Sequence, residues 1–405
     1  MDDFHRIRRL PPYVFEQVNR LKASARASGA DIIDLGMGNP DLPTPQAIVD
    51  KMCEVAQDPR THRYSASKGI AGLRKAHAAY YGRRFGVKLN PDTQVVATLG
   101  SKEGFANMAQ AITAPGDVVL VPNPTYPIHS FGFIMSGAVV RSIQAEPNDD
   151  FFHALERAVR HSIPAPTALI LNYPSNPTAR LATLDFYRDV VAFARKHNII
   201  LLSDLAYAEI FFEGEPPPSI LQVPGAMETA VEFTSMSKTY SMPGWRMGFA
   251  VGNERLVSAL TRVKSYLDYG AFTPIQVAAA FALNTQDAEI EVARDIYRQR
   301  RDVMVESFSR AGWDVPPPPA TMFAWAPIPE KFKALGSLEF SKLLVEKANV
   351  AVSPGVGFGE YGDDYVRIAL VENEHRIRQA ARNIKRFLAS ADETLHNVIP
   401  IAARR

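Results

Sequence analysis

Short apolar runs rich in valine, isoleucine and leucine alternate with segments of helical periodicity along the first two thirds of the chain. Apolar runs of this length, separated by helices, are typical of βαβ units whose parallel sheet is buried on both faces. The pattern therefore predicts an α/β fold with a mostly parallel central sheet between helices. The predicted strands are Gln94–Thr98, Asp117–Val121, Thr167–Leu171, Asn198–Leu202, Val231–Thr234 and Met247–Val251, and the clearest helices are Ser101–Ile112 and Leu184–Lys196.

The pattern changes near Asp287, where a long charged helix, Glu289–Gly312, is predicted. A closing helix is predicted from about Asn373, because apolar residues recur there at steps of three and four. Between these two helices the predicted elements are the strands Met322–Trp325, Val350–Val352 and Tyr365–Leu370 and the helix Ser337–Lys347. We therefore expect three parts: an N-terminal arm that joins the small domain (1–47), a large domain (48–286) and a small α/β domain (287–405).

Composition and charge narrow the class of protein. The 405 residues include 45 Lys and Arg against 43 Asp and Glu, a formal net charge of +2. So small an excess offers little attraction to nucleic acid or to an anionic membrane, although a local basic pocket stays possible. Cys53 is the single cysteine, and no Cys/His cluster predicts a metal site. Since no signal-peptide pattern or membrane-length apolar run is present, we expect a cytoplasmic protein.

The segment 234–249 carries the most informative group of polar residues. Ser235 and Ser237 precede Lys238 just after a predicted strand, and Arg246 follows eight positions later. Hydroxyls and a guanidinium beside a lysine suit a bound phosphate. A cationic or desolvated environment favours the neutral amine of lysine, which attacks carbonyl carbon. For this short motif alone, an ordinary solvated lysine is an equal alternative.

Polar groups also follow other predicted strands. Asp204 and Tyr207 come after Asn198–Leu202, at the strand end where open α/β sheets bind ligands. Asp204 could hold a proton on a heteroaromatic nitrogen and Tyr207 could donate to a ring oxygen, although helix capping is the alternative for Asp204. The segment 100–102, Gly-Ser-Lys, opens a predicted helix whose N–H groups could bind phosphate, or it is a plain turn. The chain lacks the glycine patterns of dinucleotide and nucleoside triphosphate sites.

Two further loops follow predicted strands. The first contains Tyr126, which could present a flat face to a cofactor ring, and the second contains Asn176. Each is a plain turn in the alternative interpretation, because Asn-Pro runs are common in turns. The coincidence of five strand ends, each with a polar group suited to one ligand, favours a common site.

Together, Asp204-x-x-Tyr207, Ser235-x-Ser237-Lys238, Arg246 and Asn176-Pro177-Thr178 resemble the class I/II aminotransferases of pyridoxal-phosphate fold type I. The resemblance runs from the segment 34–40 to the segment 365–367, nearly the whole chain. Within the family, the segments 9–15, 268–270 and 353–359 are similar to those of bacterial alanine (glutamate–pyruvate) transaminases.

The resemblance implies a role for each matching residue. Lys238 would form the Schiff base with pyridoxal 5'-phosphate, Asp204 would partner the pyridinium nitrogen, and Arg367 would bind the substrate α-carboxylate with help from Gly38. The remaining implied contacts are Asn176 and Tyr207 with the ring oxygen, Asn176 also with substrate, Tyr126 stacked on the ring, and Gly100, Ser101, Lys102, Ser235, Ser237 and Arg246 at the phosphate. Tyr64, and less directly Thr273, would reach the neighbouring subunit's cofactor, which implies a homodimer with shared active sites.

The activity implied by the resemblance is amino transfer between an L-amino acid, alanine or glutamate, and a 2-oxo acid, pyruvate or 2-oxoglutarate, with ping-pong kinetics. No second arginine is assigned to a substrate side-chain carboxylate, so aspartate is less favoured than alanine. His129 could line the substrate pocket or be a structural histidine. The alternatives are a C–S β-lyase of the same fold, an aspartate- or aromatic-type transaminase, and a cofactor-sensing regulator, which would need a DNA-binding segment before residue 34.

Overall fold

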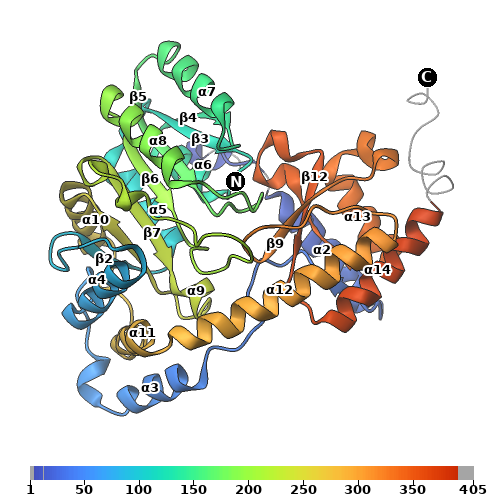
Figure 1. Ribbon diagram of the computed structural model, residues 1–405, viewed down its shortest axis with the longest axis horizontal. Coiled ribbons are helices and arrows are strands. Elements are labelled where there is room, and N and C mark those ends of the chain that lie inside the picture. The colour runs from blue at the N-terminus through green and yellow to red at the C-terminus, as the bar shows by residue number, and fades with distance from the viewer. Residues whose placement is uncertain (1–3, 12, 391–405) are drawn as a thin grey trace.

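A seven-stranded mixed sheet forms the centre of the computed structural model, which describes residues 4–11 and 13–390 (Figure 1). The strand order is β2-β8-β7-β6-β5-β3-β4, and β8 alone runs antiparallel to its neighbours. The strands are β2 (Val95–Thr98), β3 (Val118–Asn123), β4 (Val139–Gln144), β5 (Pro166–Asn172), β6 (Ile200–Asp204), β7 (Ala230–Ser235) and β8 (Gly248–Gly252). The predicted α/β class with a mostly parallel sheet is confirmed, and β4 is the strand that the sequence pattern missed.

Both faces of this sheet are buried, which explains its continuous apolar strands. Along β5, Leu169 and Leu171 belong to one hydrophobic cluster, whereas Ala168 and Ile170 belong to another. Successive side chains of a strand point to opposite faces, so each of these clusters covers one side of the sheet. The helices in Figure 1 lie on both sides of the strands.

A second, smaller sheet lies toward the C-terminus. It is antiparallel, with the order β11-β12-β9, and it packs in a hydrophobic cluster of its own together with Ile33 and Leu35. The short strand β1 pairs with β10, so a segment near the N-terminus is bound to the C-terminal part of the chain. The strands are β1 (Ile33–Asp34), β9 (Phe323–Pro327), β10 (Val350–Ala351), β11 (Ser353–Pro354) and β12 (Tyr365–Ala369). The division at residues 47/48 and 286/287 stays a prediction.

Helices make up most of the remaining described chain. The α-helices are α1 (His5–Arg8), α2 (Val14–Ala27), α3 (Gln46–Ala56), α4 (Ala71–Phe85), α5 (Ser101–Ile112), α6 (Ile128–Ser136), α7 (Asp149–Arg160), α8 (Leu184–His197), α9 (Met236–Thr239), α10 (Glu254–Leu267), α11 (Thr273–Thr285), α12 (Asp287–Arg310), α13 (Gly336–Ala348) and α14 (Glu374–Ala389). Short 3₁₀ helices are η1 (Pro59–His62), η2 (Ile220–Gln222), η3 (Ala226–Glu228), η4 (Glu330–Leu335), η5 (Gly355–Phe358) and η6 (Glu360–Gly362). Among the described residues, no helix combines the length and the apolar character needed to cross a membrane.

The long helix α12 connects the two sheets. It contacts α11 beside the large sheet and α14 beside the small one, and Figure 1 shows it running between them. The sequence placed this helix two residues too late, at 289–312. It ends at Arg310 because Gly312 adopts a left-handed φ of 90°, which stops the helical hydrogen-bond pattern.

Candidate active site

The carboxyl ends of the parallel strands bring the predicted polar residues to one edge of the large sheet. Asp204 is the last residue of β6, and Asn172 ends the neighbouring β5. The short helix α9 begins directly after β7 and carries Lys238. Because β5, β6 and β7 are adjacent and parallel, their polar ends lie side by side, as in other open α/β sheets that bind ligands at this edge.

The amine of Lys238 lies in a confined space between the two sheets. Its Nζ donates a hydrogen bond to the carbonyl oxygen of Gly38 at 3.0 Å and lies 5.8 Å from the centre of the Tyr207 ring. Burial, together with the charges of Arg367 and Arg246, lowers the pKa of Lys238 to about 7. Near neutral pH a large share of this amine is therefore unprotonated, the form that attacks a carbonyl carbon.

Arg367 lies on β12 and faces this space from the small sheet. Its Nη1 donates to Asn176 Oδ1 at 2.8 Å, and its guanidinium stacks on Phe323 and Phe358 at 4.0 and 4.7 Å from the ring centres. Burial lowers its pKa to about 10, so it stays a cation at neutral pH. Its Nε is buried without a hydrogen-bond partner in the described structure.

Asp204 is held by a histidine for which the sequence left two interpretations. His129 Nε2 lies 2.9 Å from Asp204 Oδ2, and its Nδ1 lies 2.7 Å from Thr125 Oγ1. The backbone N–H of Ala206 donates to Asp204 Oδ1 at 3.1 Å. His129 is fully buried with both ring nitrogens bonded, which supports its structural interpretation, and it orients the Asp204 carboxylate. In the sequence, the contact between Thr125 and His129 was indicated only by their four-residue spacing, with Thr125 in the loop before α6 and His129 in its first turn.

A second group of polar atoms gathers around the start of α5. Arg246 Nη2 donates to the carbonyl oxygen of Leu99 at 3.1 Å, next to Gly100. No side chain caps the first turn of α5, which begins at Ser101, so its N–H groups stay available. Gly100 has a left-handed φ of 83°, which favours glycine there, and a Cβ atom at this position would also meet Arg246 Nη2 at 2.2 Å. Ser235 accepts a hydrogen bond from the N–H of Ser237 at 3.2 Å.

The structure brings most of the predicted site residues together, with exceptions. A cavity of about 140 Å³ is lined by Gly38, Tyr126 and Arg367, among others. Tyr207 is buried, and its ring packs edge-on against Phe323. Three residues are exceptions. Lys102 is exposed and lines a neighbouring apolar groove, and Tyr64 is exposed with its ring against Tyr269. Thr273 is half-buried at the start of α11. The roles given to all of the predicted site residues stay predictions.

Comparison with known proteins identifies the family. The family model "Aminotransferase class I and II" matches residues 30–384, most of the chain. The chain belongs to the class I and II aminotransferases. This family uses pyridoxal 5'-phosphate as its cofactor, as the sequence resemblance implied, and the enzyme is therefore a pyridoxal-phosphate-dependent aminotransferase.

Of three similar aminotransferases, two are named for different substrates and one for none. AatC of Rhizobium meliloti (strain 1021), itself only provisionally named an aminotransferase, is 80% identical over the whole of both chains. The glutamate-pyruvate aminotransferase AlaC of Escherichia coli (strain K12) is 53% identical over 94% of this chain and 93% of its own. The LL-diaminopimelate aminotransferase of Moorella thermoacetica (strain ATCC 39073 / JCM 9320) is 40% identical over 97% of this chain and all of its own.

A solved structure supports the same aminotransferase fold. Substrate-bound BacF from Bacillus subtilis is 36% identical, has a TM-score of 0.88, and is matched over 93% of this chain and 95% of its own. With the family match, this likeness confirms the predicted pyridoxal-phosphate fold type I. The Pro12 position within the predicted family segment 9–15 lies outside the described residues.

The donor set at the strand ends fits this cofactor. A dianionic phosphate binds to hydrogen-bond donors, and several lie here. They are the uncapped N–H groups of α5, the Ser235 and Ser237 hydroxyls and the Arg246 guanidinium. A buried carboxylate, Asp204, suits a protonated ring nitrogen. The amine of Lys238, with its lowered pKa, suits the cofactor's aldehyde.

Proposed function

We propose that this aminotransferase moves the amino group between L-alanine or L-glutamate and pyruvate or 2-oxoglutarate. The observation that carries this proposal is a cavity of about 140 Å³ lined by Arg367 and by Gly38, whose carbonyl oxygen accepts a hydrogen bond from Lys238 Nζ. Among the described residues that line this cavity, Lys22 is the other cation, and its Nζ is already bound to Asp34 at 2.7 Å. A small side chain such as that of alanine fits such a space, and the 53% identity to AlaC agrees with it.

Arg367 positions the substrate in this mechanism. Its guanidinium would bind the α-carboxylate through two parallel hydrogen bonds. Asn176 Oδ1 and the rings of Phe323 and Phe358 restrict the guanidinium, so little freedom is lost when the carboxylate binds. The α-carbon of the amino acid then faces Lys238.

Lys238 would carry the cofactor at rest and move the proton during the reaction. Pyridoxal phosphate supplies an aldehyde for the amino group and a protonated ring that accepts electron density from the α-carbon. The neutral Nζ of Lys238, once free of the cofactor, would accept the α-proton of the amino acid and would later return a proton during the reaction. Asp204, oriented by His129 and Ala206, would hold the proton on the ring nitrogen, and Tyr207 and Asn176 would donate to the ring oxygen.

The lowered pKa of Lys238 predicts how capture of the cofactor by the apoenzyme depends on pH. The rate should rise about tenfold per pH unit below pH 7 and level off above it, because only the neutral amine reacts. Stopped-flow absorbance of apoenzyme mixed with pyridoxal phosphate at fixed ionic strength measures this profile. A rate that still rises tenfold per unit up to pH 10 would show an ordinary, solvated lysine.

We also propose a homodimer with shared active sites in the reducing cytoplasm. Large apolar and aromatic side chains are exposed around Tyr64, and a second copy of the chain would bury them. They are Tyr64, Tyr266, Leu267, Tyr269 and Phe272. Through this surface Tyr64 and Thr273 would reach the cofactor phosphate of the partner. The exposed single cysteine, Cys53, agrees with a compartment that keeps thiols reduced.

A panel of half-reactions tests the substrate proposal. Holoenzyme is mixed with one amino acid at a time, and the change in cofactor absorbance gives a rate for each. We expect L-alanine and L-glutamate to react with kcat/KM values at least about tenfold above those of L-aspartate and L-phenylalanine. Faster reaction with L-aspartate, or release of ammonia and pyruvate from cysteine conjugates, would refute the proposal in favour of an aspartate-type transaminase or a β-lyase.

LL-diaminopimelate is the second candidate substrate, and the panel includes it. The polar residues Asn19, Lys22 and Asp34 line the same cavity as Arg367, and they could bind a second amino-acid group. The 40% identity to the LL-diaminopimelate aminotransferase of Moorella thermoacetica supports this alternative. A faster half-reaction with LL-diaminopimelate than with L-alanine would favour it.

A further inference from the structure

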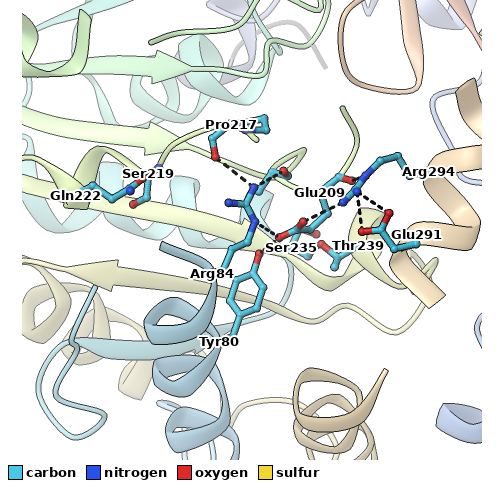
Figure 2. Close-up of polar contacts among 11 residues, drawn as sticks. Tyr80, Arg84, Glu209, Pro217, Ser219, Gln222, Ser235, Thr239, Glu291 and Arg294 are labelled. Atoms are coloured by element: carbon cyan, nitrogen blue, oxygen red, sulfur yellow. Dashed lines mark hydrogen bonds and ion pairs between the residues drawn. The ribbon is translucent and has the colours of Figure 1, made fainter. Parts of the chain in front are cut away.

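A buried carboxylate lies two residues beyond Tyr207, outside the contacts described so far. Glu209 has a side chain that is only 5% exposed, and it accepts hydrogen bonds from the Tyr80 hydroxyl and, at 3.0 Å, from Arg84 Nε. Its other oxygen lies 3.5 Å from Arg294 Nη2. Figure 2 shows the two arginines approaching Glu209 from opposite sides. Tyr80 and Arg84 belong to α4, whereas Arg294 belongs to α12.

The same arginines also hold the backbone on either side of this carboxylate. Arg84 Nη2 donates to the carbonyl oxygens of Ala208 and Pro217, both at 3.3 Å. Arg294 Nε donates to the carbonyl oxygen of Glu209 at 3.0 Å, and its guanidinium stacks on the Phe211 ring at 4.0 Å. The segment that leaves Asp204 and Tyr207 is therefore bound to a helix that packs on the large sheet and to the helix that connects both sheets.

This segment continues to the wall that supports Arg367. The N–H of Phe212 donates to Pro319 at 2.9 Å, and the N–H of Thr321 donates to Ile210 at 2.8 Å. Two residues further, Phe323 packs against both the Tyr207 ring and the Arg367 guanidinium. A shift of the segment around Glu209 would therefore reach the proposed cofactor contacts on one side and the proposed carboxylate contact on the other.

Arg84 and Arg294 are partly buried, with side chains 20% and 14% exposed, and Glu209 is the carboxylate that both of them approach. Its loss would remove the one acidic side chain that these contacts share between α4 and α12, although Arg294 would keep Glu291. We propose that Glu209 is a positioning residue of the active site. It binds α4 and α12 at once and thereby holds the Asp204–Tyr207 turn in line with Arg367. The inference rests on the proposed roles of Asp204, Tyr207 and Arg367, and it adds a residue that touches neither substrate nor cofactor.

The test compares Glu209→Gln with the matched control Glu291→Gln in the holoenzyme. Glu291 is the exposed second partner of Arg294, at 2.8 Å, so its loss leaves the Glu209 contacts in place. In Glu209→Gln we expect the KM for L-alanine to rise about tenfold with a smaller fall in kcat, because substrate alignment is lost. The proposed hydrogen bond from Tyr207 to the cofactor's ring oxygen should also weaken, which favours the protonated form of the lysine–cofactor bond. The pH midpoint of the cofactor absorbance should therefore rise by about half a unit or more.

Hydrogen exchange supplies a readout that needs neither cofactor nor turnover. The amides of Phe212 and Thr321 should exchange about tenfold faster in Glu209→Gln than in the wild type or in Glu291→Gln. Should Glu209→Gln fail to fold, Arg294→Met tests the α12 side alone. It removes the Arg294 contacts with Glu209, Glu291 and the Phe211 ring and leaves Tyr80 and Arg84 on Glu209. In the double variant Glu209→Gln/Arg294→Met, amide exchange should be no faster than in the more affected of the two single variants.

The outcomes separate this inference from the proposed function. A folded Glu209→Gln protein with a lower melting temperature but wild-type KM, absorbance midpoint and amide exchange would overturn the positioning role. The positioning role is likewise overturned if Arg294→Met alone is soluble and behaves as the wild type. If instead the cofactor absorbance of the wild type is unchanged in Lys238→Ala, the proposed function itself fails.

Discussion

Replacing Lys238 with alanine is expected to abolish amino transfer, lowering kcat by about 10⁴-fold or more. The variant loses both the amine that binds the cofactor's aldehyde and the base that carries the α-proton. No rearrangement is expected elsewhere, since Nζ makes one hydrogen bond, to the Gly38 carbonyl oxygen. Steady-state transamination with L-alanine and 2-oxoglutarate measures the loss, and absorbance reports the missing lysine–cofactor bond.

Borohydride reduction of the holoenzyme followed by peptide mass spectrometry checks the same assignment chemically. The reduced cofactor should be found on the peptide that contains Lys238 in the wild type and be absent from Lys238→Ala. Lys196→Ala, on the exposed face of α8, is the control and should keep both activity and labelling. A label on another lysine, or substantial turnover without Lys238, would remove the basis of the proposed mechanism.

The apolar strands made much of the large sheet predictable from sequence. Both faces of β5, β6 and β7 are buried, so their residues read as continuous apolar runs, and the polar residue that ends each run marks the ligand edge. Strand β4, at one edge of the sheet, gave no such signal, because Val139 and Ser142 are exposed and Arg141 interrupts the run. The other edge strand, β2, was predicted because it is buried throughout, so burial rather than position in the sheet decides whether the local pattern indicates a strand.

The long-range contacts of the site could not be read from the sequence in the same way. His129 and Asp204 are 75 residues apart, and Arg84 and Glu209 are 125 apart, so no local spacing announces either pair. Family resemblance singled out Arg367, but its approach to Asn176 depends on how β12 faces the large sheet. Tyr64 was assigned to a neighbouring subunit, and its outward position in a single chain leaves that prediction to an experiment on the assembled enzyme.

Replacing Arg367 should weaken the binding of all substrates to a similar extent. Each amino acid and each 2-oxo acid carries a carboxylate next to the reacting carbon, so loss of the bidentate guanidinium contact should lower kcat/KM about 100-fold in both half-reactions. The effect should fall mainly on KM, since Lys238 and Asp204 remain. Arg367→Ala removes the side chain outright, and Arg367→Met keeps most of its volume between Phe323 and Phe358.

The comparison of several substrates decides whether Arg367 recognises the shared carboxylate or a particular side chain. Rates for L-alanine, L-glutamate and pyruvate should fall by similar factors in Arg367→Met, whereas Arg180→Ala, which loses only the exposed ion pair with Glu146, should leave them unchanged. A fall confined to L-glutamate would mean that Arg367 binds the distal carboxylate. The α-carboxylate would then need another partner. The proposal of a small substrate would fail as well, because it requires Arg367 to bind the group that all substrates share.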